Sequence, residues 1–302
     1  MMKRKNSGAR NLAKRQTPYL LIAPSIAVIT AALLIPVAYA VYLSGTDANM
    51  LSLSSYHFVG LDNYKKFFTS PSLGKVFRST LIYVVLGVFL TYVIGLGAAL
   101  ILNMKLRMKP LFRAILILPW AIPQVVLVLI WKWMLNPQYG CINYLFSSLH
   151  LIPMNFSWFS DPKFAIIAIM LVTIWKQYPL SCLILFAGMK TISGELYETA
   201  SIDGASAFQR FFYITLPGLK YVNSVLVLLL TIWSFTNFVI IWLLTMGGPS
   251  DQTATLSIFT YLNAFKFSKL GYGASIGVVC LIVSLIFSFF YYRVFITDVN
   301  ND

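Results

Sequence analysis

The stretch ELYETASIDGASAFQRFFYITLP at residues 195–217 is the most informative part of this 302-residue chain. It is a polar, helix-forming segment between two long apolar runs, and Gly204 divides it because glycine tolerates a left-handed backbone. Its charged residues are Glu195, Glu198, Asp203 and Arg210. A membrane protein with short loops has little reason to build an ordered element of this length outside the bilayer unless a partner docks there. The sequence therefore predicts a docking element made of two short helices.

Both halves of this segment carry signals for the start of a helix. Ser193 is placed to cap the first helix. Ser206 and Gln209 have the spacing of a capping box for the second helix. The apolar face of the second helix would be formed by Phe208, Phe211 and Phe212. An amphipathic helix resting on lipid headgroups is the plain alternative, but anionic headgroups would repel Glu198 and Asp203.

The composition excludes an ordinary soluble domain, because 59% of the residues are apolar and only 11% are charged. A transmembrane helix needs about 20 mostly apolar residues. We therefore predict an all-α, polytopic membrane protein with about six transmembrane helices. The expected spans are 18–43, 80–103, 112–134, 164–188, 219–245 and 272–294.

The net charge of +14 is distributed as in a membrane protein. Its two basic clusters are Lys3, Arg4, Lys5, Arg10, Lys14 and Arg15 near the N-terminus, and Lys105, Arg107, Lys109 and Arg113 after the second run. Because positive residues mark cytoplasmic loops, we expect the tail 1–17, the segment 189–217 and the tail 295–302 on the cytoplasmic side. Attraction to anionic lipids accounts for these clusters better than binding of nucleic acid does.

The outer loop 44–79 contains FVGLDNYKKFF at residues 58–68, which predicts a short amphipathic helix on the membrane surface. We expect Asp62 and Asn63 to cap that helix. Its interfacial side chains would be Tyr64, Phe67 and Phe68. Two roles stay open for the helix: anchoring in the interface, or contact with a partner from outside.

Other classes of membrane protein find little support. An ion-coupled secondary transporter, the remote alternative, would need coupling acids within spans, but all nine Asp and Glu residues lie outside them. No inverted repeat is visible. An intramembrane enzyme would need a catalytic set in the bilayer, and none is visible. The three cysteines and two histidines are too scattered for disulfides or a metal site, so no metal ligands are assigned.

Several polar or aromatic residues fall within the expected spans. Lys176 lies near the middle of 164–188, where an ionisable group is costly and usually faces a cavity. Aromatic rings stack on the C–H surfaces of sugars, and amides satisfy sugar hydroxyls. The set that supplies both is Trp120, Gln124, Thr173, Lys176, Gln177, Trp233, Ser234 and Asn237. Interhelical hydrogen bonding or packing is the alternative for each of these residues.

The docking segment resembles the cytoplasmic coupling loop of ABC importer permeases. That loop has the pattern Glu-Ala-Ala, three residues, Gly, nine residues, Ile, one residue, Leu-Pro. The matching residues here are Glu198, Thr199, Ala200, Gly204, Ile214, Leu216 and Pro217, with Thr199 as the one departure. The stretches ILPWAIP (117–123), WFSDP (158–162) and LLTMGGP (243–249) extend the likeness to carbohydrate permeases of the maltose and glycerol-phosphate type, specifically to the larger maltose-permease-like subunit.

The resemblance implies a type I ABC importer transmembrane domain over residues 80–294, in a multi-pass protein of the bacterial inner membrane. It implies four kinds of partner: a second homologous permease, two ABC ATPase subunits, an extracytoplasmic sugar-binding protein and a carbohydrate. The residues it assigns to ATPase coupling are Glu198, Thr199, Ala200, Asp203, Gly204, Leu216 and Pro217. The chain has no Gly-x4-Gly-Lys-Ser/Thr loop. We therefore expect no enzyme activity and no cofactor on this chain, with ATP-Mg on the partner subunits.

The resemblance also implies a substrate pathway. Its positions correspond here to Trp120, Gln124, Thr173, Lys176, Gln177, Leu180, Trp233, Ser234 and Asn237. The identities of the side chains differ from those of the maltose relative, so the particular sugar is left open. A cationic Lys176 adds the alternative that the substrate is anionic, a uronate oligosaccharide or a glycerol phosphate.

Overall fold

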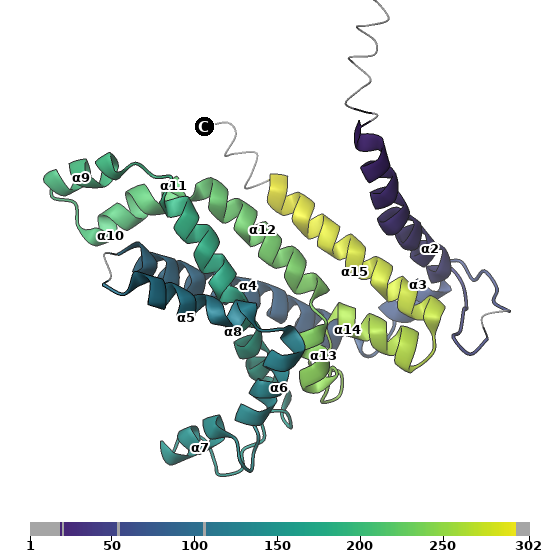
Figure 1. Cartoon of the computed structure of the whole chain (residues 1–302). Coiled ribbons are helices and arrows are strands. Elements are labelled where there is room, and N and C mark those ends of the chain that lie inside the picture. Colours follow the sequence, from purple (N-terminus) through teal and green to yellow (C-terminus); the bar gives the residue numbers. More distant parts are fainter. Residues whose placement is uncertain (1–18, 20, 53–54, 105–106, 294–302) are drawn as a thin grey trace, which may run out of the picture.

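The computed structural model describes residues 19, 21–52, 55–104 and 107–293, and it is built from helices (Figure 1). Within these ranges the only β structure is two isolated bridges, one of which pairs Thr46 with Phe58. The all-α prediction is confirmed. The expected basic tail 1–17 and the C-terminal tail 295–302 lie outside the described residues.

Four helices in the described ranges are long and apolar enough to cross a membrane, and up to six spans result if each of two bent helix pairs counts as one. The four are Leu21–Ser44, which includes η1 (Thr30–Leu34) and α2 (Ile35–Ser44), α4 (Leu73–Asn103), α8 (Pro162–Met189) and α15 (Leu270–Tyr291). This agrees with the expected number of spans. Because α4 begins at Leu73 instead of residue 80, the outer segment 44–79 is shorter than expected.

The expected span 112–134 is broken in the structure. Its two parts are α5 (Lys109–Ala121) and α6 (Gln124–Met134), which meet at an angle of 97°. Pro123 causes the break, because proline disfavours a helical backbone at the residue before it and offers no N–H to a preceding carbonyl. Ile122 is accordingly extended, with ψ of 131°.

The second bent pair is Ala207–Gly218 with Lys220–Thr236, at 69°. The expected span 219–245 is interrupted at a different point, near Asn237. α12 (Lys220–Thr236) ends at Asn237, whose ψ of 120° is extended, and α13 (Val239–Thr245) begins after Phe238. The Asn237 carbonyl accepts a hydrogen bond from Ser257 Oγ at 3.0 Å instead of continuing the helix. The remaining helical elements are α3 (Asp62–Phe68), α7 (Cys141–Ser148), α9 (Gly194–Ile202), α10 (Ala207–Arg210), η2 (Phe211–Thr215), α11 (Leu216–Gly218), α14 (Leu256–Tyr261) and η3 (Leu262–Lys266).

The core of the bundle is the packing of α4 against α8, with α12 and α15 alongside (Figure 1). Helices in lipid associate through close packing of small residues, since lipid is as apolar as their side chains. Gly95 of α4 lies against Ser181 of α8, and a Cβ at position 95 would overlap the serine side chain. This glycine therefore sets how closely the two longest helices approach.

We expect Gly95→Ala to destabilise the protein and Gly97→Ala to leave it unchanged or more stable. Alanine has the better helix propensity by about 1 kcal/mol at both positions. Only position 95 is blocked, because nothing lies within 4 Å of a Cβ at Gly97. Overpacking typically costs about 1–3 kcal/mol. Thermal unfolding of the two purified variants measures the difference, and equal melting temperatures would contradict this packing.

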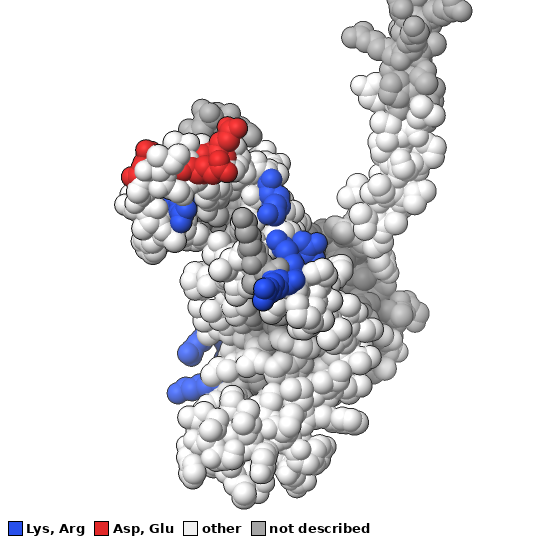
Figure 2. All heavy atoms as spheres, turned by 60° about the vertical axis from the view of Figure 1, so that its left-hand side comes forward, with Lys and Arg blue, Asp and Glu red and all other residues white. Residues whose placement is uncertain are grey.

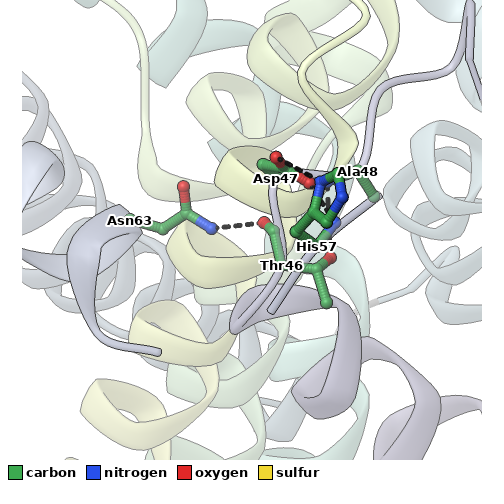
Figure 3. Close-up of polar contacts among 5 residues, drawn as sticks. All are labelled: Thr46, Asp47, Ala48, His57 and Asn63. Carbon is green, nitrogen blue, oxygen red and sulfur yellow. Dashed lines mark hydrogen bonds and ion pairs between the residues drawn. The ribbon is translucent and has the colours of Figure 1, made fainter. Parts of the chain in front are cut away.

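The short outer helix forms as predicted, but its start differs from the prediction. Leu61 occupies the position before α3 and makes no side-chain cap, so the expected capping by Asp62 and Asn63 is wrong. The Asn63 amide donates instead to the carbonyls of Ser44 at 2.9 Å and Thr46 at 2.7 Å. Figure 3 shows the second of these contacts. The amide thus ties α3 to the end of α2.

The aromatic side chains of α3 were expected at the membrane interface, but two of the three pack within the protein. Phe67 is fully buried in the core, and the Tyr64 hydroxyl bonds Ser44 Oγ at 2.6 Å. Phe68 alone of the three is exposed. The adjoining loop is closed by Asp47, which accepts a 2.6 Å hydrogen bond from the His57 amide (Figure 3). The main role of α3 is therefore structural: it packs on the bundle and joins the outer segment to it.

Candidate functional site

Seven of the nine residues assigned to a substrate pathway line one pocket of about 300 Å³. This central pocket lies where the break between α5 and α6 faces α8 and the break between α12 and α13. Its lining is Trp120, Gln124, Lys176, Gln177, Leu180, Trp233, Thr236, Asn237, Phe238 and Val239. The helix breaks at Pro123 and at Asn237 therefore border the same space.

Lys176 of α8 donates hydrogen bonds to the broken span at the break between α5 and α6. Its Nζ donates to the carbonyls of Trp120 and Ile122, each at 2.6 Å, and of Pro119 at 3.3 Å. These carbonyls lie at the C-terminal end of α5, where the break deprives them of helical partners. A positive charge there also complements the negative end of the helix dipole. A lysine ammonium has three N–H donors, and all three are matched by carbonyls of this one turn.

Thr173 and Ser234 were assigned to the pathway but do not line the pocket. Both are buried, with 2% and 3% of their surfaces exposed. The Thr173 hydroxyl bonds the hydroxyl of Tyr83 on α4 at 3.1 Å, so it joins two helices of the bundle. Interhelical bonding, the alternative considered from the sequence, describes Thr173 in this structure.

The central pocket combines two exposed indole rings with three amide side chains. Trp120 and Trp233 are 48% and 41% exposed, large values for tryptophans within expected spans. The amides are those of Gln124, Gln177 and Asn237, and no Asp or Glu lines the pocket. Such a lining offers flat apolar faces together with neutral donors and acceptors, which is the chemistry that binds polyhydroxylated rings.

Three lining residues were not predicted from the sequence. They are Thr236, Phe238 and Val239, which flank Asn237 at the start of α13. The ring of Phe238 stacks on Trp242 with an interplanar angle of 15°. What brings them to the pocket is the interruption of the helix at Asn237, which turns several consecutive residues toward it. This interruption cannot be recognised from an apolar run of sequence.

The predicted docking segment has the local structure expected of it. Ser193 accepts from the Glu195 amide at 3.3 Å, and Ser206 and Gln209 form both bonds of a capping box. Gly204 separates the helices with a φ of +79°, in the left-handed region. We call residues 193–218, which include α9 and α10, the docking element.

The docking element is rigid within itself and exposed outside. The Tyr197 hydroxyl bonds Thr215 Oγ1 at 3.0 Å, and Arg210 donates to Ser201 Oγ, so its two halves are joined. Figure 1 shows α9 and α10 projecting beyond the ends of α8 and α12. Neither α9 nor α10 buries a residue completely. An element whose halves are joined and whose helices α9 and α10 bury no residue has the form of a connector to another protein.

The outer surface of the docking element is apolar and acidic. Ile202 and Phe208 are 85% and 72% exposed, and the ring of Phe208 lies 4.5 Å from that of Phe212. Acidic side chains gather over this end of the molecule (Figure 2), and none of its acids forms an ion pair in the described part of the chain. These acids are Glu195, Glu198 and Asp203. Exposed apolar groups rimmed by charge mark protein contacts.

The chain is thus a multi-helical bundle with a polar pocket at its helix breaks and an exposed helical element between α8 and α12. Residues 91–300 match the family model described as binding-protein-dependent transport system inner membrane component, and the chain belongs to this family.

Two relatives and one solved structure show the breadth of the likeness. The trehalose/maltose transport system permease protein of Thermococcus litoralis is 35% identical over 91% of this chain and 92% of its own length. The sulfoquinovosyl glycerol transport system permease protein of Agrobacterium fabrum is 34% identical over 94% of this chain and 92% of its own. A bacterial alginate ABC transporter, solved with an alginate pentasaccharide-bound periplasmic protein, shares the fold with a TM-score of 0.79 at 21% identity, over 94% and 95% of the two chains.

Proposed function

We propose that this chain is one permease subunit of an ATP-driven importer for a carbohydrate, and that it forms half of the translocation pathway. The observation that carries the proposal is the central pocket, whose indole and amide groups suit a sugar. A pocket open on one side of a single chain is completed by a second, homologous permease. An extracytoplasmic binding protein would deliver the sugar, as the family description implies.

The docking element would receive the driving force. Two ATPase subunits would close on ATP-Mg, and one of them would grip α9 through Glu198 and the exposed apolar residues beside it. Because Tyr197 and Arg210 join the two halves of the element, it would move as one body and pull α8 and α12 with it. The chain itself would hydrolyse nothing. The docking element and both termini would lie on the cytoplasmic side of a bacterial inner membrane.

The geometry favours a neutral carbohydrate over an anionic one. Lys176 suggested an anionic substrate, but its three ammonium hydrogens are directed at the carbonyls of Pro119, Trp120 and Ile122. A substrate carboxylate would have to displace one of these bonds to receive an N–H. The groups that face the pocket without this engagement are neutral amides and aromatic rings. A uronate or glycerol phosphate remains the alternative that the uptake experiment below distinguishes.

We expect Trp233→Leu to weaken sugar uptake by roughly tenfold, on the scale of other aromatic stacking contacts. Trp133→Leu is the matched control, because that tryptophan is 71% exposed on α6 and lies outside the pocket. The measurement is uptake of labelled neutral and uronic sugars by the assembled importer at a range of concentrations. The proposal predicts a raised half-saturation concentration for neutral sugars with Trp233→Leu alone. Equal effects of the two variants, or uptake of uronates only, would contradict it.

A further inference from the structure

Three basic side chains converge on one aromatic ring at the end of the bundle from which the docking element projects. The Nζ atoms of Lys109 and Lys190 lie 5.2 and 5.3 Å from the centroid of the Phe186 ring, and the Arg113 guanidinium carbon lies 5.1 Å from it. Lys109 and Arg113 are one turn apart on α5, and Lys190 caps the end of α8. We call these four residues the basic cluster.

No acidic side chain in the described part of the chain forms an ion pair with the basic cluster. The two ion pairs in the described part of the chain, His57–Asp47 and Lys65–Asp62, lie elsewhere. The Phe186 ring attracts a cation by about 0.5–1 kcal/mol at an exposed site. Because the ring has no net charge, it does not neutralise the three cations. The three cations lie within about one Debye length, ~10 Å at 0.1 M salt, so they repel one another.

The position of the cluster adds to this excess of positive potential. α5 begins at Lys109 with no side-chain cap and no acidic residue in its first turn. The positive end of its dipole therefore lies on the same turn as Lys109 and Arg113, whereas Lys190 lies at the negative end of the α8 dipole. Basic residues at a helix N-terminus are unfavourable unless an anion binds there. Figure 2 shows basic side chains on the surface below the acidic end of the molecule.

The surroundings indicate what kind of anion fits. Along its length α5 exposes four large apolar side chains: Leu111, Phe112, Ile115 and Leu118. The cluster thus lies at the level where a span enters the membrane, with charge at the end and hydrocarbon surface beside it. A phosphate carried by a phospholipid meets both features, whereas free phosphate or an acidic peptide meets only the first.

We propose that Lys109, Arg113 and Lys190, arranged around Phe186, form a binding site for the phosphate headgroup of an anionic phospholipid between α5 and α8. A bound headgroup would neutralise three mutually repelling cations and accept hydrogen bonds from the α5 terminus. It would also fix the distance between α8, which leads into the docking element, and α5, which borders the central pocket. The site depends on the membrane topology of these helices and not on the identity of the transported solute.

The test is native mass spectrometry of the full-length chain mixed with equal amounts of phosphatidylglycerol and phosphatidylcholine. Wild type should retain phosphatidylglycerol preferentially. The triple variant K109Q/R113Q/K190Q should lose affinity by on the order of 100-fold, since each surface cation contributes roughly fivefold. The matched control K66Q/K163Q/K266Q removes the same charge from exposed positions elsewhere, and it should keep the preference. If the triple variant fails to fold, K109Q alone should still lower the affinity roughly fivefold.

Four outcomes would overturn the proposal. Equal phosphatidylglycerol retention by wild type and the triple variant would remove the site. An equal loss in the control variant would show attraction by net charge alone. Displacement of the lipid by inorganic phosphate at the same concentration would identify a free-anion site. Unchanged lipid binding by the triple variant, together with lost assembly with the ATPase subunits, would identify a protein contact in place of a lipid site.

Discussion

Glu198→Lys abolishes sugar uptake and weakens association with the ATPase subunit, with membrane insertion unchanged, if the docking element transmits the driving force. Glu198 is exposed and forms no ion pair in the described residues. In the proposed coupling role, Glu198 would lie against basic residues of the ATPase. Reversal of its charge would create like-charge contact, which costs several kcal/mol at an interface. We expect uptake to fall by on the order of 100-fold, as measured in cells with membrane levels of the chain determined in parallel.

Two further variants separate a specific contact from a general charge effect. Glu198→Gln removes the attraction without adding repulsion and should give an intermediate loss of uptake. Glu195→Lys makes the same charge change in the first turn of the same helix, at a position outside the coupling motif, and should lose less uptake than Glu198→Lys. Unimpaired uptake by Glu198→Lys would count decisively against the proposed coupling role.

Lys176→Met lowers both stability and uptake, because it leaves the carbonyls of Pro119, Trp120 and Ile122 without their donor. Hydrogen bonds to charged groups contribute about 1.5–3 kcal/mol each, and partial exposure of the lysine places the total loss at roughly 2 kcal/mol or more. For a chain of 302 residues this corresponds to a fall in melting temperature of roughly 3 °C or more. The measurement is thermal unfolding of the purified chain together with uptake by the assembled importer.

The matched control for this prediction is Gln177→Met, at the next residue of the same pocket. It should reduce uptake and leave the melting temperature unchanged, since it makes no bond to the broken span among those described. Lys176→Arg keeps the charge and the donors and should restore much of the lost stability. An unchanged melting temperature for Lys176→Met would show that the lysine does not hold the break, and would return it to the role of a substrate contact.

The number of spans and the local structure of the docking element could be predicted from the sequence, because both depend on neighbouring residues. Long apolar runs identify spans by composition alone. The caps at Ser193 and Ser206 and the turn at Gly204 need only side chains within a few positions. Such signals do not depend on how the chain packs at a distance.

The two helix breaks differ in how far the sequence indicates them. Pro119, Pro123 and Pro179 are expected to interrupt their spans as hinges or static kinks. The break occurs at Pro123, which disfavours a helical Ile122. Asn237 carried no comparable signal, because its extended backbone is supported by Ser257, twenty positions away. Thr173 was misplaced in the pocket for the same reason: its partner Tyr83 lies on another helix. Contacts between distant helices decide which polar residue faces a cavity.

The central claim is that this chain is a passive gate that separate ATPase subunits move through the docking element. The most direct test is accumulation of labelled sugar in proteoliposomes that contain this chain and its partner permease, with and without the ATPase subunits, each supplied with ATP and loaded binding protein. The account predicts accumulation against a gradient only when the ATPase subunits are present. Uphill accumulation without them would contradict it.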